Sequence, residues 1–438
     1  MKLRILPLTL ALTAALTGAA QAQSLVQLYE SAKGYDATFK AAQSQYQANL
    51  AKAEQAKGLL RPTVGLGATL SESDFDNKTN TNIDARYGTQ STTFSASHPL
   101  FRPANAAGYE QGMKQLGLAK AQLKAAEQDL VVRVSQAYFD VLTAQEALAF
   151  VKAQKTAVSE QLAAAKRNFE VGTSTITDTR EVQARFDLVI AQEIASENDL
   201  RVKKLALDQT VGTQNAQPRP LKPGANLNQA GSSDAETWVK QATEQNPGIE
   251  QARIGLEVAQ LETEKAKAGH LPTLDLTASY GLTRFRNGNL TSRVDNNSGT
   301  IGLSFNLPIY TGAVTSNRIQ ETVYLADKAR NDLEASQRTV GQTTRTAFYG
   351  LQSGLGQVNA LEAAEASSQS ALDANKLGYQ VGVRINIDVL NSQSQLFQTK
   401  RDLAKARYDV LLGQLKLRQA AGVLKAEDVQ SINDLLAP

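Results

Sequence analysis

The chain has 438 residues, of which 42% are hydrophobic and 20% charged, which is enough for two or three globular domains. Its net charge of +3, without a block of like charges, gives no reason to expect nucleic acid as a partner. The absence of cysteine excludes disulfides, thiol chemistry and attachment through an acylated N-terminal cysteine.

The first 22 residues are organised like a secretory signal peptide. Two basic residues precede the short apolar run 5–16, and small residues occupy the last positions before the expected cut between Ala22 and Gln23. A run of about 12 apolar residues is too short to span a bilayer, and no other segment approaches the ~20 that a spanning helix needs. We therefore expect an exported mature chain that only strands could hold in a membrane.

Residues 23–213 form a first structural repeat in our interpretation. A helical pattern, broken near Lys33 and Gly34, runs to Pro62, where the period of the apolar residues changes from 3.6 to 2. Apolar residues at heptad spacing then predict two long helices with coiled-coil packing, separated by a turn at Gly172. The expected elements are strands at about 62–75 and 87–98, the second ending at Pro99, and long helices at about 104–169 and 177–211.

Residues 214–235 are rich in proline and glycine and are expected to be a surface linker, after which the pattern recurs. Gly172 and Asp178 match Gly382 and Asp388, each 210 positions later, so the chain is an internal duplication. The second repeat covers 236–424, and a C-terminal tail without clear pattern covers 425–438. The expected elements of the second repeat are strands at about 272–286 and 299–307 and long helices at about 314–379 and 386–424.

Each expected strand has one apolar face, and such a face needs a partner. An open sheet cannot lie in lipid because its edge amides would be unpaired. Closed membrane barrels begin at about eight strands, so the four strands of one chain would need further chains. The alternative is a soluble sandwich domain whose apolar face is its core. The signal peptide and the position of both strand pairs between long helices favour the membrane.

Three stretches give the chain a family resemblance: GHLPTLDLTASY (269–280), GLSFNLPIYTG (302–312) and GYQVGVRINIDVLN (378–391). The mature chain resembles the TolC-type outer-membrane efflux and secretion channels over nearly its whole length. The resemblance implies an α+β membrane protein of a Gram-negative outer membrane that assembles as a homotrimer. Four strands from each chain would form a twelve-stranded β-barrel, continuous with a long α-helical coiled-coil barrel in the periplasm. The linker and the tail would lie in an equatorial belt.

The resemblance also implies a function and partners. The chain would be the passive exit duct of a tripartite export system that carries drugs, toxic compounds and type I secreted proteins. Its partners would be outer-membrane lipid, a periplasmic adaptor (membrane fusion protein) and an inner-membrane pump of the RND, ABC or MFS type. A non-conducting periplasmic coiled-coil scaffold or adaptor is the alternative. An adaptor normally has one helical hairpin, whereas this chain has two repeats with lipid-suited strands.

In that family, polar contacts near the two turns close the periplasmic end. Carried onto matching positions, the gate latch consists of Thr177 and Asp178 at the first turn and of Tyr379 and Arg384 at the second. An arginine–carboxylate pair is directional and can break when a partner binds. A structural alternative for Asp178 is a carboxylate in the first turn of a helix, stabilised by the helix dipole. The same alternative applies to Asp388.

The resemblance places Asp388 at the pore constriction, repeated around the axis, where a ring of carboxylates selects cations. Related chains often carry a second aspartate one helical turn later, and here that position is Asn391. We therefore expect a weaker cation preference and weaker block by multivalent cations.

Small residues mark the two turns, and they have two interpretations. Glycine permits the positive φ that ends a helix. In the family, such turn residues also border grooves that receive the hairpin tips of the adaptor. The expected adaptor-contact residues are Val171, Gly172, Val381 and Gly382.

Enzymatic function is not expected. The only histidines, His98 and His270, have no neighbours at ligand spacing, which argues against a metal site or a catalytic triad. No phosphate-binding or dinucleotide-binding glycine pattern occurs. We therefore expect no cofactor, no metal and no catalytic residue. Trp238 is expected to be a packing residue of the belt.

Overall fold

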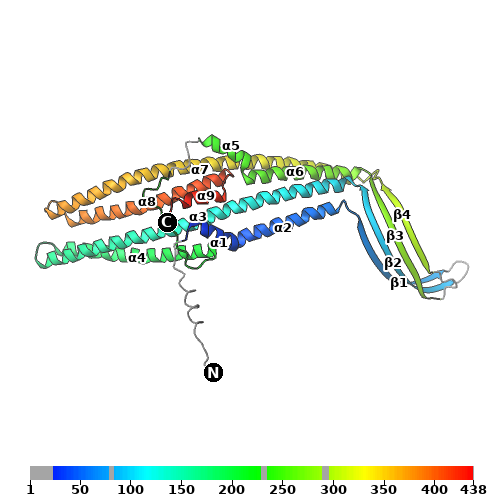
Figure 1. Cartoon of the computed structure of the whole chain (residues 1–438), viewed down its shortest axis with the longest axis horizontal. Helices are drawn as coiled ribbons and strands as arrows, with labels where there is room; N and C mark the ends of the chain where they lie inside the picture. Colours follow the sequence, from blue (N-terminus) through cyan, green and yellow to red (C-terminus); the bar gives the residue numbers. More distant parts are fainter. Residues whose placement is uncertain (1–22, 78–82, 228–233, 289–294, 438) are drawn as a thin grey trace, which may run out of the picture. The chain divides into compact units, whose positions relative to one another are not determined.

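The computed structural model describes residues 23–77, 83–227, 234–288 and 295–437. The expected signal peptide, with Ala22, lies outside these residues. The chain divides into two units. One is made of the residues up to 42, 124–249 and those from 337 on; the other of 43–123 and 250–336. The long helices α3 (Pro103–Glu170) and α7 (Val314–Gln380) contribute to both units (Figure 1).

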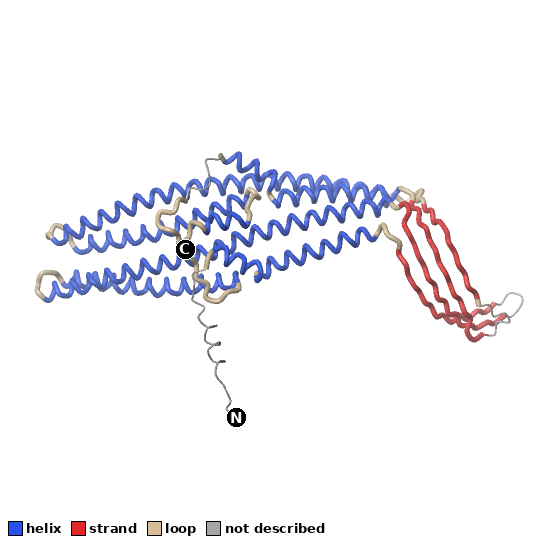
Figure 2. Tube along the Cα trace, viewed as in Figure 1, coloured by secondary structure: helices blue, strands red, loops and turns tan. Residues whose placement is uncertain are grey.

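The second unit holds a single antiparallel sheet whose four strands follow one another in chain order (Figure 2). The two expected strand pairs are therefore joined edge to edge, because β2 of the first repeat pairs with β3 of the second. The strands are β1 (Thr63–Asn77), β2 (Ile83–Phe101), β3 (Thr273–Gly288) and β4 (Asn296–Asn306).

The register of the sheet separates apolar from polar side chains onto opposite faces. Directly paired residues point to the same face, and successive residues of a strand alternate between the faces. One row of the apolar face consists of Val64, Ala96, Ala278 and Ile301, and the next contains Leu66, Phe94 and Tyr280. A row of the opposite face consists of Gly65, Ser95, Ser279 and Thr300.

The apolar face is uncovered in the single chain. Leu66 is 73% exposed and Ile301 is 81% exposed. A soluble sandwich would bury this face as its core, so that alternative does not hold for the described residues of this chain. The face is instead available to an apolar environment outside the chain.

Strand β2 is longer than expected, and the prediction that it ends at Pro99 is wrong. Beyond Ser97 the strand pairs only with β3, because β1 begins opposite Ser97 at Thr63. Proline lacks an N–H group and is tolerated where a strand has a free side or an irregular register. The register shifts between Pro99 and Phe101, so the strand continues past the proline.

Asp275 is held by an ion pair at the beginning of β3. Both of its carboxylate oxygens accept hydrogen bonds from Arg102, at 2.7 Å from Nε and 2.6 Å from Nη2. Arg102 lies between β2 and α3, so this bidentate contact fixes the junction between sheet and helix within the second unit.

The helices repeat with the expected spacing. α1 (Leu25–Tyr35), α2 (Ala37–Gly58) and α4 (Ile176–Val211) have counterparts α5 (Ala235–Gln245), α6 (Pro247–Lys267) and α8 (Asn386–Ala420), each of which begins 210 positions later. A short 3-10 helix (Ala268–His270) follows α6. α3 and α4 form one hairpin and α7 and α8 another (Figure 1).

The C-terminal residues are ordered, in contrast to the patternless tail that we expected. They contain α9 (Ala426–Asn433), with buried Val429 and Ile432. Asp428 forms an ion pair with Arg418 of α8. An isolated bridge between Leu221 and Leu436 fastens the end of the chain to the linker. Linker and C-terminal residues therefore pack together, although their place in an equatorial belt stays a prediction.

Candidate functional site at the two helical turns

Both long helices end in the same backbone geometry. Gly172 and Gly382 have φ of +75° and +78°, in the left-handed region that glycine adopts without strain. The N–H of Thr173 donates to the carbonyl oxygen of Asn168, and that of Val383 to the carbonyl oxygen of Gly378, both at 2.8 Å. These bonds satisfy carbonyl groups that the helix end leaves free. The valines before the two glycines, Val171 and Val381, are exposed.

The first turn uses its carboxylate to begin the next helix. Thr175 is the N-cap of α4, and its Oγ1 accepts the N–H of Asp178 at 3.2 Å. In return, Asp178 Oδ2 accepts the N–H and the hydroxyl of Thr175, at 3.0 and 2.9 Å. This reciprocal capping box satisfies the carboxylate within its own helix. The structural alternative for Asp178 therefore holds, while Thr177 beside it is exposed.

The second turn has no such cap. Its N-cap residue is Ile385, which has no side-chain acceptor. Asp388 instead lies 3.7 Å from Arg384 Nη1, and the two side chains are 34% and 57% exposed. A pair at this distance and exposure is a weak ion pair that exchanges readily with water or another partner. The stem of Arg384 lies against Gly378, where an added Cβ would meet Arg384 Cγ at 2.7 Å.

The structure does not connect the two halves of the expected latch. Among the described residues, no recorded hydrogen bond or ion pair joins Thr177 or Asp178 to Tyr379 or Arg384. Tyr379 is exposed at the end of α7. Within the described part of this single chain, the expected latch therefore stays a prediction.

The two hairpins meet through a contact that the sequence did not reveal. Arg185 of α4 donates from Nη2 to Oδ1 of Asn391 in α8, at 2.7 Å. One residue earlier, Leu390 is 2% exposed and packs into the core of the first hairpin. No spacing rule within one repeat could have found Arg185, since it lies 206 residues from Asn391 in the sequence.

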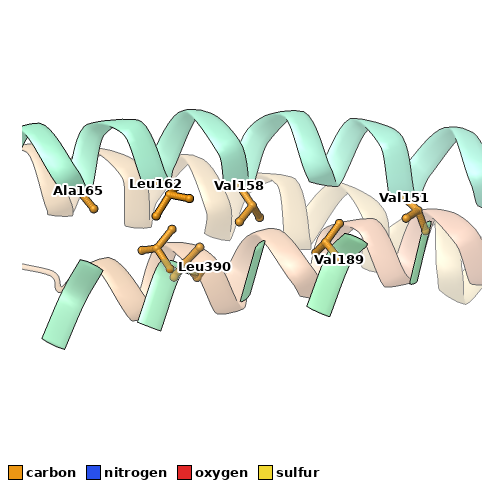
Figure 3. Close-up of a cluster of buried hydrophobic side chains, with 7 residues drawn as sticks. Val151, Val158, Leu162, Ala165, Val189 and Leu390 are labelled. Atoms are coloured by element: carbon orange, nitrogen blue, oxygen red, sulfur yellow. The ribbon is translucent and has the colours of Figure 1, made fainter. Parts of the chain in front are cut away.

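Figure 3 shows this core between the hairpins. Leu390 of α8 lies opposite the row of apolar side chains on α3, at the level of Leu162. Ile387 packs against the same cluster. The helix that carries Asp388 and Asn391 is thus fixed by its apolar contacts with α3 and α4. The cluster consists of Val151, Val158, Leu162, Ala165, Val182, Val189 and Leu390.

Within the described ranges, no group of three histidine, cysteine, aspartate or glutamate side chains is placed to hold a metal ion. None of the helices in those ranges combines the length and the apolar character needed to cross a bilayer.

Comparison with known proteins places this arrangement in a family. The family model described as outer membrane efflux protein matches residues 28–213 and 238–423, so each repeat is matched separately. The outer membrane protein TolC of Vibrio cholerae is 32% identical, and the alignment covers 98% of each chain. The alkaline protease secretion protein AprF of Pseudomonas aeruginosa is 30% identical, with 80% of this chain and 73% of the relative covered.

Solved structures show the same fold. The outer membrane protein VceC of Vibrio cholerae superimposes with a TM-score of 0.78, at 20% identity, and covers 91% of this chain and 96% of its own.

Proposed function

Because the chain belongs to the outer membrane efflux protein family, we propose that it is an exit duct of a Gram-negative outer membrane for efflux and type I secretion. Efflux is named in the description of the family model, and protease secretion in the name of the relative AprF. The observation that carries the proposal is the sheet, whose apolar face is exposed and whose opposite face is small and polar. Such a sheet suits a wall between lipid and a water-filled interior.

The assembly follows from the number of strands. Four strands are too few to close a membrane barrel, and an open edge in lipid leaves backbone groups unpaired. Three chains with four strands each would close a barrel of twelve. The hairpins α3–α4 and α7–α8 would then surround the periplasmic part of the duct, with linker and α9 in the belt.

A duct of this kind needs partners, since the chain has no nucleotide-binding pattern to supply energy. The partners would be a periplasmic adaptor and an inner-membrane pump of the RND, ABC or MFS type. The exposed turn residues Val171, Gly172, Val381 and Gly382 offer a contact surface for the adaptor.

The gate would lie at the turns. The weak pair between Arg384 and Asp388 leaves the guanidinium group able to bind Thr177 or Asp178 of a neighbouring chain, and Tyr379 is exposed beside it. Asp388 and Asn391 would line the constriction. The closed state would be held by several such polar contacts between chains.

The test is single-channel conductance of the purified protein in a planar lipid bilayer. We expect a small conductance for the wild type and a conductance several times larger for Arg384→Ala, because the latch is lost. Asp388→Ala should change the cation-to-anion permeability ratio with a smaller effect on conductance. Arg201→Ala, which removes an exposed arginine from the C-terminal half of α4, is the matched control and should behave as the wild type.

The outcomes separate the parts of the proposal. Channels that neither Arg384→Ala nor Asp388→Ala affects would retain the duct and contradict the gate. No channels from folded, trimeric protein would contradict the duct and favour the scaffold alternative.

A further inference from the structure

The two repeats of one chain touch along a contact between α8 and α3. The ring of Tyr408 in α8 stacks on the ring of Phe139 in α3, with the centroids 5.7 Å apart. The hydroxyl group of Tyr408 donates to the carboxylate of Glu146, also in α3. Further along both helices, Lys416 donates to Gln136. Because the chain is duplicated, α4 and α7 carry the positions equivalent to α8 and α3.

These equivalent positions are exposed in the single chain. Phe139 is 2% exposed, whereas Tyr349 of α7, its counterpart 210 positions later, is 57% exposed. Tyr408 is buried, whereas its counterpart Asn198 of α4 is exposed. In the first unit, α4 and α7 lie on the outer sides of the long helices, with α3 and α8 between them (Figure 1). Both halves of a second contact of this kind are therefore present and open.

The exposed face of α4 around Asn198 is apolar, and we call it the α4 face. Three apolar side chains lie four residues before, four after and seven after Asn198, which places them on the same side of the helix. Each is more than half exposed, while the equivalent residues of α8 are buried on the side of Tyr408 that packs on α3. Such a face indicates a contact outside the chain. The exposed residues are Ile194, Val202 and Leu205, and their buried counterparts are, in the same order, Ala404, Leu412 and Leu415.

We propose that the α4 face of one chain packs on α7 of a second copy, in the register in which α8 packs on α3. Asn198 would lie beside Tyr349 and Gly356 of the second copy, since Gly356 is the counterpart of Glu146. The occupant is a second copy because the chain itself carries both halves of the contact. The contact is heterologous, so it repeats from copy to copy until a ring closes. The proposal rests on the proposed function in needing several chains, and it adds which helices join and in what register.

The test is cross-linking between engineered cysteines, since the natural chain has none. Asn198→Cys combined with Tyr349→Cys in one chain, treated with a short bismaleimide in membranes, should lose its monomer band to covalent oligomers. The matched control combines Tyr349→Cys with Asp187→Cys, an exposed position of α4 about 16 Å along the helix from Asn198. This pair should keep its monomer band. Each single-cysteine variant should keep it too, because equal positions do not meet in a heterologous contact.

A second experiment rebuilds the contact of α8 and α3 between copies. Asn198→Tyr combined with Gly356→Glu supplies the tyrosine and the carboxylate that this contact uses. A side chain at Gly356 meets no atom of the single chain within 4 Å of its Cβ, so the glutamate fits. The double variant should raise the temperature at which the oligomer dissociates in detergent by more than the two single variants together. Helical circular dichroism of each variant should match the wild type.

The outcomes separate this proposal from the proposed function. If the pair Asn198→Cys and Tyr349→Cys cross-links no better than the control pair, or if the effects of Asn198→Tyr and Gly356→Glu simply add, the contact in this register is wrong. Channels recorded from the same protein would then leave the duct intact. Efficient cross-linking of folded protein that forms no channels would support the contact and overturn the proposed function.

Discussion

Asp178 and Asp388 occupy equivalent positions, three residues after the N-cap of the helix that follows each turn. In the first repeat, Thr175 takes up the carboxylate in a capping box. In the second repeat, the N-cap is Ile385, and the carboxylate is left with Arg384 at 3.7 Å. One side chain therefore stabilises its own helix, and the other keeps a partly exposed charge in a weak ion pair.

A second pair of equivalent positions differs in the same way. Asp36 lies between α1 and α2 and binds Arg133 through both oxygens, at 2.8 and 3.0 Å. Its counterpart Asn246 lies between α5 and α6 and donates to the carbonyl oxygen of Ala420 at 2.8 Å. Here the first repeat has the charge pair and the second a neutral hydrogen bond.

The two repeats thus share a backbone but differ in where their charges are satisfied. In each pair, the first repeat uses its carboxylate for structure. At the turns, the second repeat leaves a partly exposed carboxylate and an exposed arginine in a weak ion pair, which in the proposed duct could exchange with another chain or a permeating ion. We infer that the second turn carries more of the gating function than the first.

The largest expected effect is on stability, and it comes from Leu390 of the second repeat, which packs into the core of the first hairpin. Leu390→Ala should lower the free energy of unfolding by about 3 kcal/mol, because the side chain is fully packed and its removal leaves a cavity. Urea unfolding in detergent, followed by helical circular dichroism, measures this change.

Leu377→Ala on α7 is the matched control, because Leu377 is exposed. Its effect should be below about 0.5 kcal/mol. Equal losses for the two variants would mean that Leu390 does not join the hairpins in the way that the structure shows.

The next effect depends on pH. Hydrogen bonds from Arg133 hold the pKa of Asp36 below its ordinary value of 3.8. The pair therefore stabilises the fold above that value, and its contribution is lost as the pH falls through the lower pKa of the folded state. Asp36→Asn, which keeps the helix cap, should cost about 2 kcal/mol at pH 7 and progressively less in acid.

Urea unfolding at several pH values would show whether the free energies of unfolding of the wild type and Asp36→Asn converge in acid. Asp129→Asn is the control, since Asp129 binds the same arginine from an exposed position; its cost should stay below about 0.5 kcal/mol. In the second repeat, Asn246→Asp should bring no gain, because Thr343 occupies the position equivalent to Arg133. A cost for Asp36→Asn that did not change with pH would contradict the charge pair.

Much of this architecture could be predicted from the sequence, because it depends on local patterns. The change of the apolar period to 2 after Pro62 indicated the strand β1, and Gly172 and Gly382 indicated the turns. The contact between Arg185 and Asn391 could not be predicted, since it joins residues of different repeats with no periodic relation. The continuation of β2 past Pro99 could not be predicted either. It depends on how β1 and β3 pair with β2, which the sequence of β2 alone does not determine.

The smallest effect is expected from a substitution that makes the N-cap of the second turn like that of the first. Ile385 is exposed, and its φ and ψ of −95° and 160° are close to the −87° and 159° of Thr175. Ile385→Thr should therefore create the missing capping box with Asp388 and stabilise α8 by about 1 kcal/mol.

Ile385→Thr should also weaken the ion pair between Asp388 and Arg384, because the carboxylate of Asp388 would accept hydrogen bonds from the new capping box. Single-channel recording should then show a changed permeability ratio together with the increased stability. Ile385→Val, which keeps the branched shape without the hydroxyl group, should show neither effect. If Ile385→Thr gained stability but conducted as the wild type, Asp388 would be as structural as Asp178, and the functional difference between the two turns would have to lie in Arg384 alone.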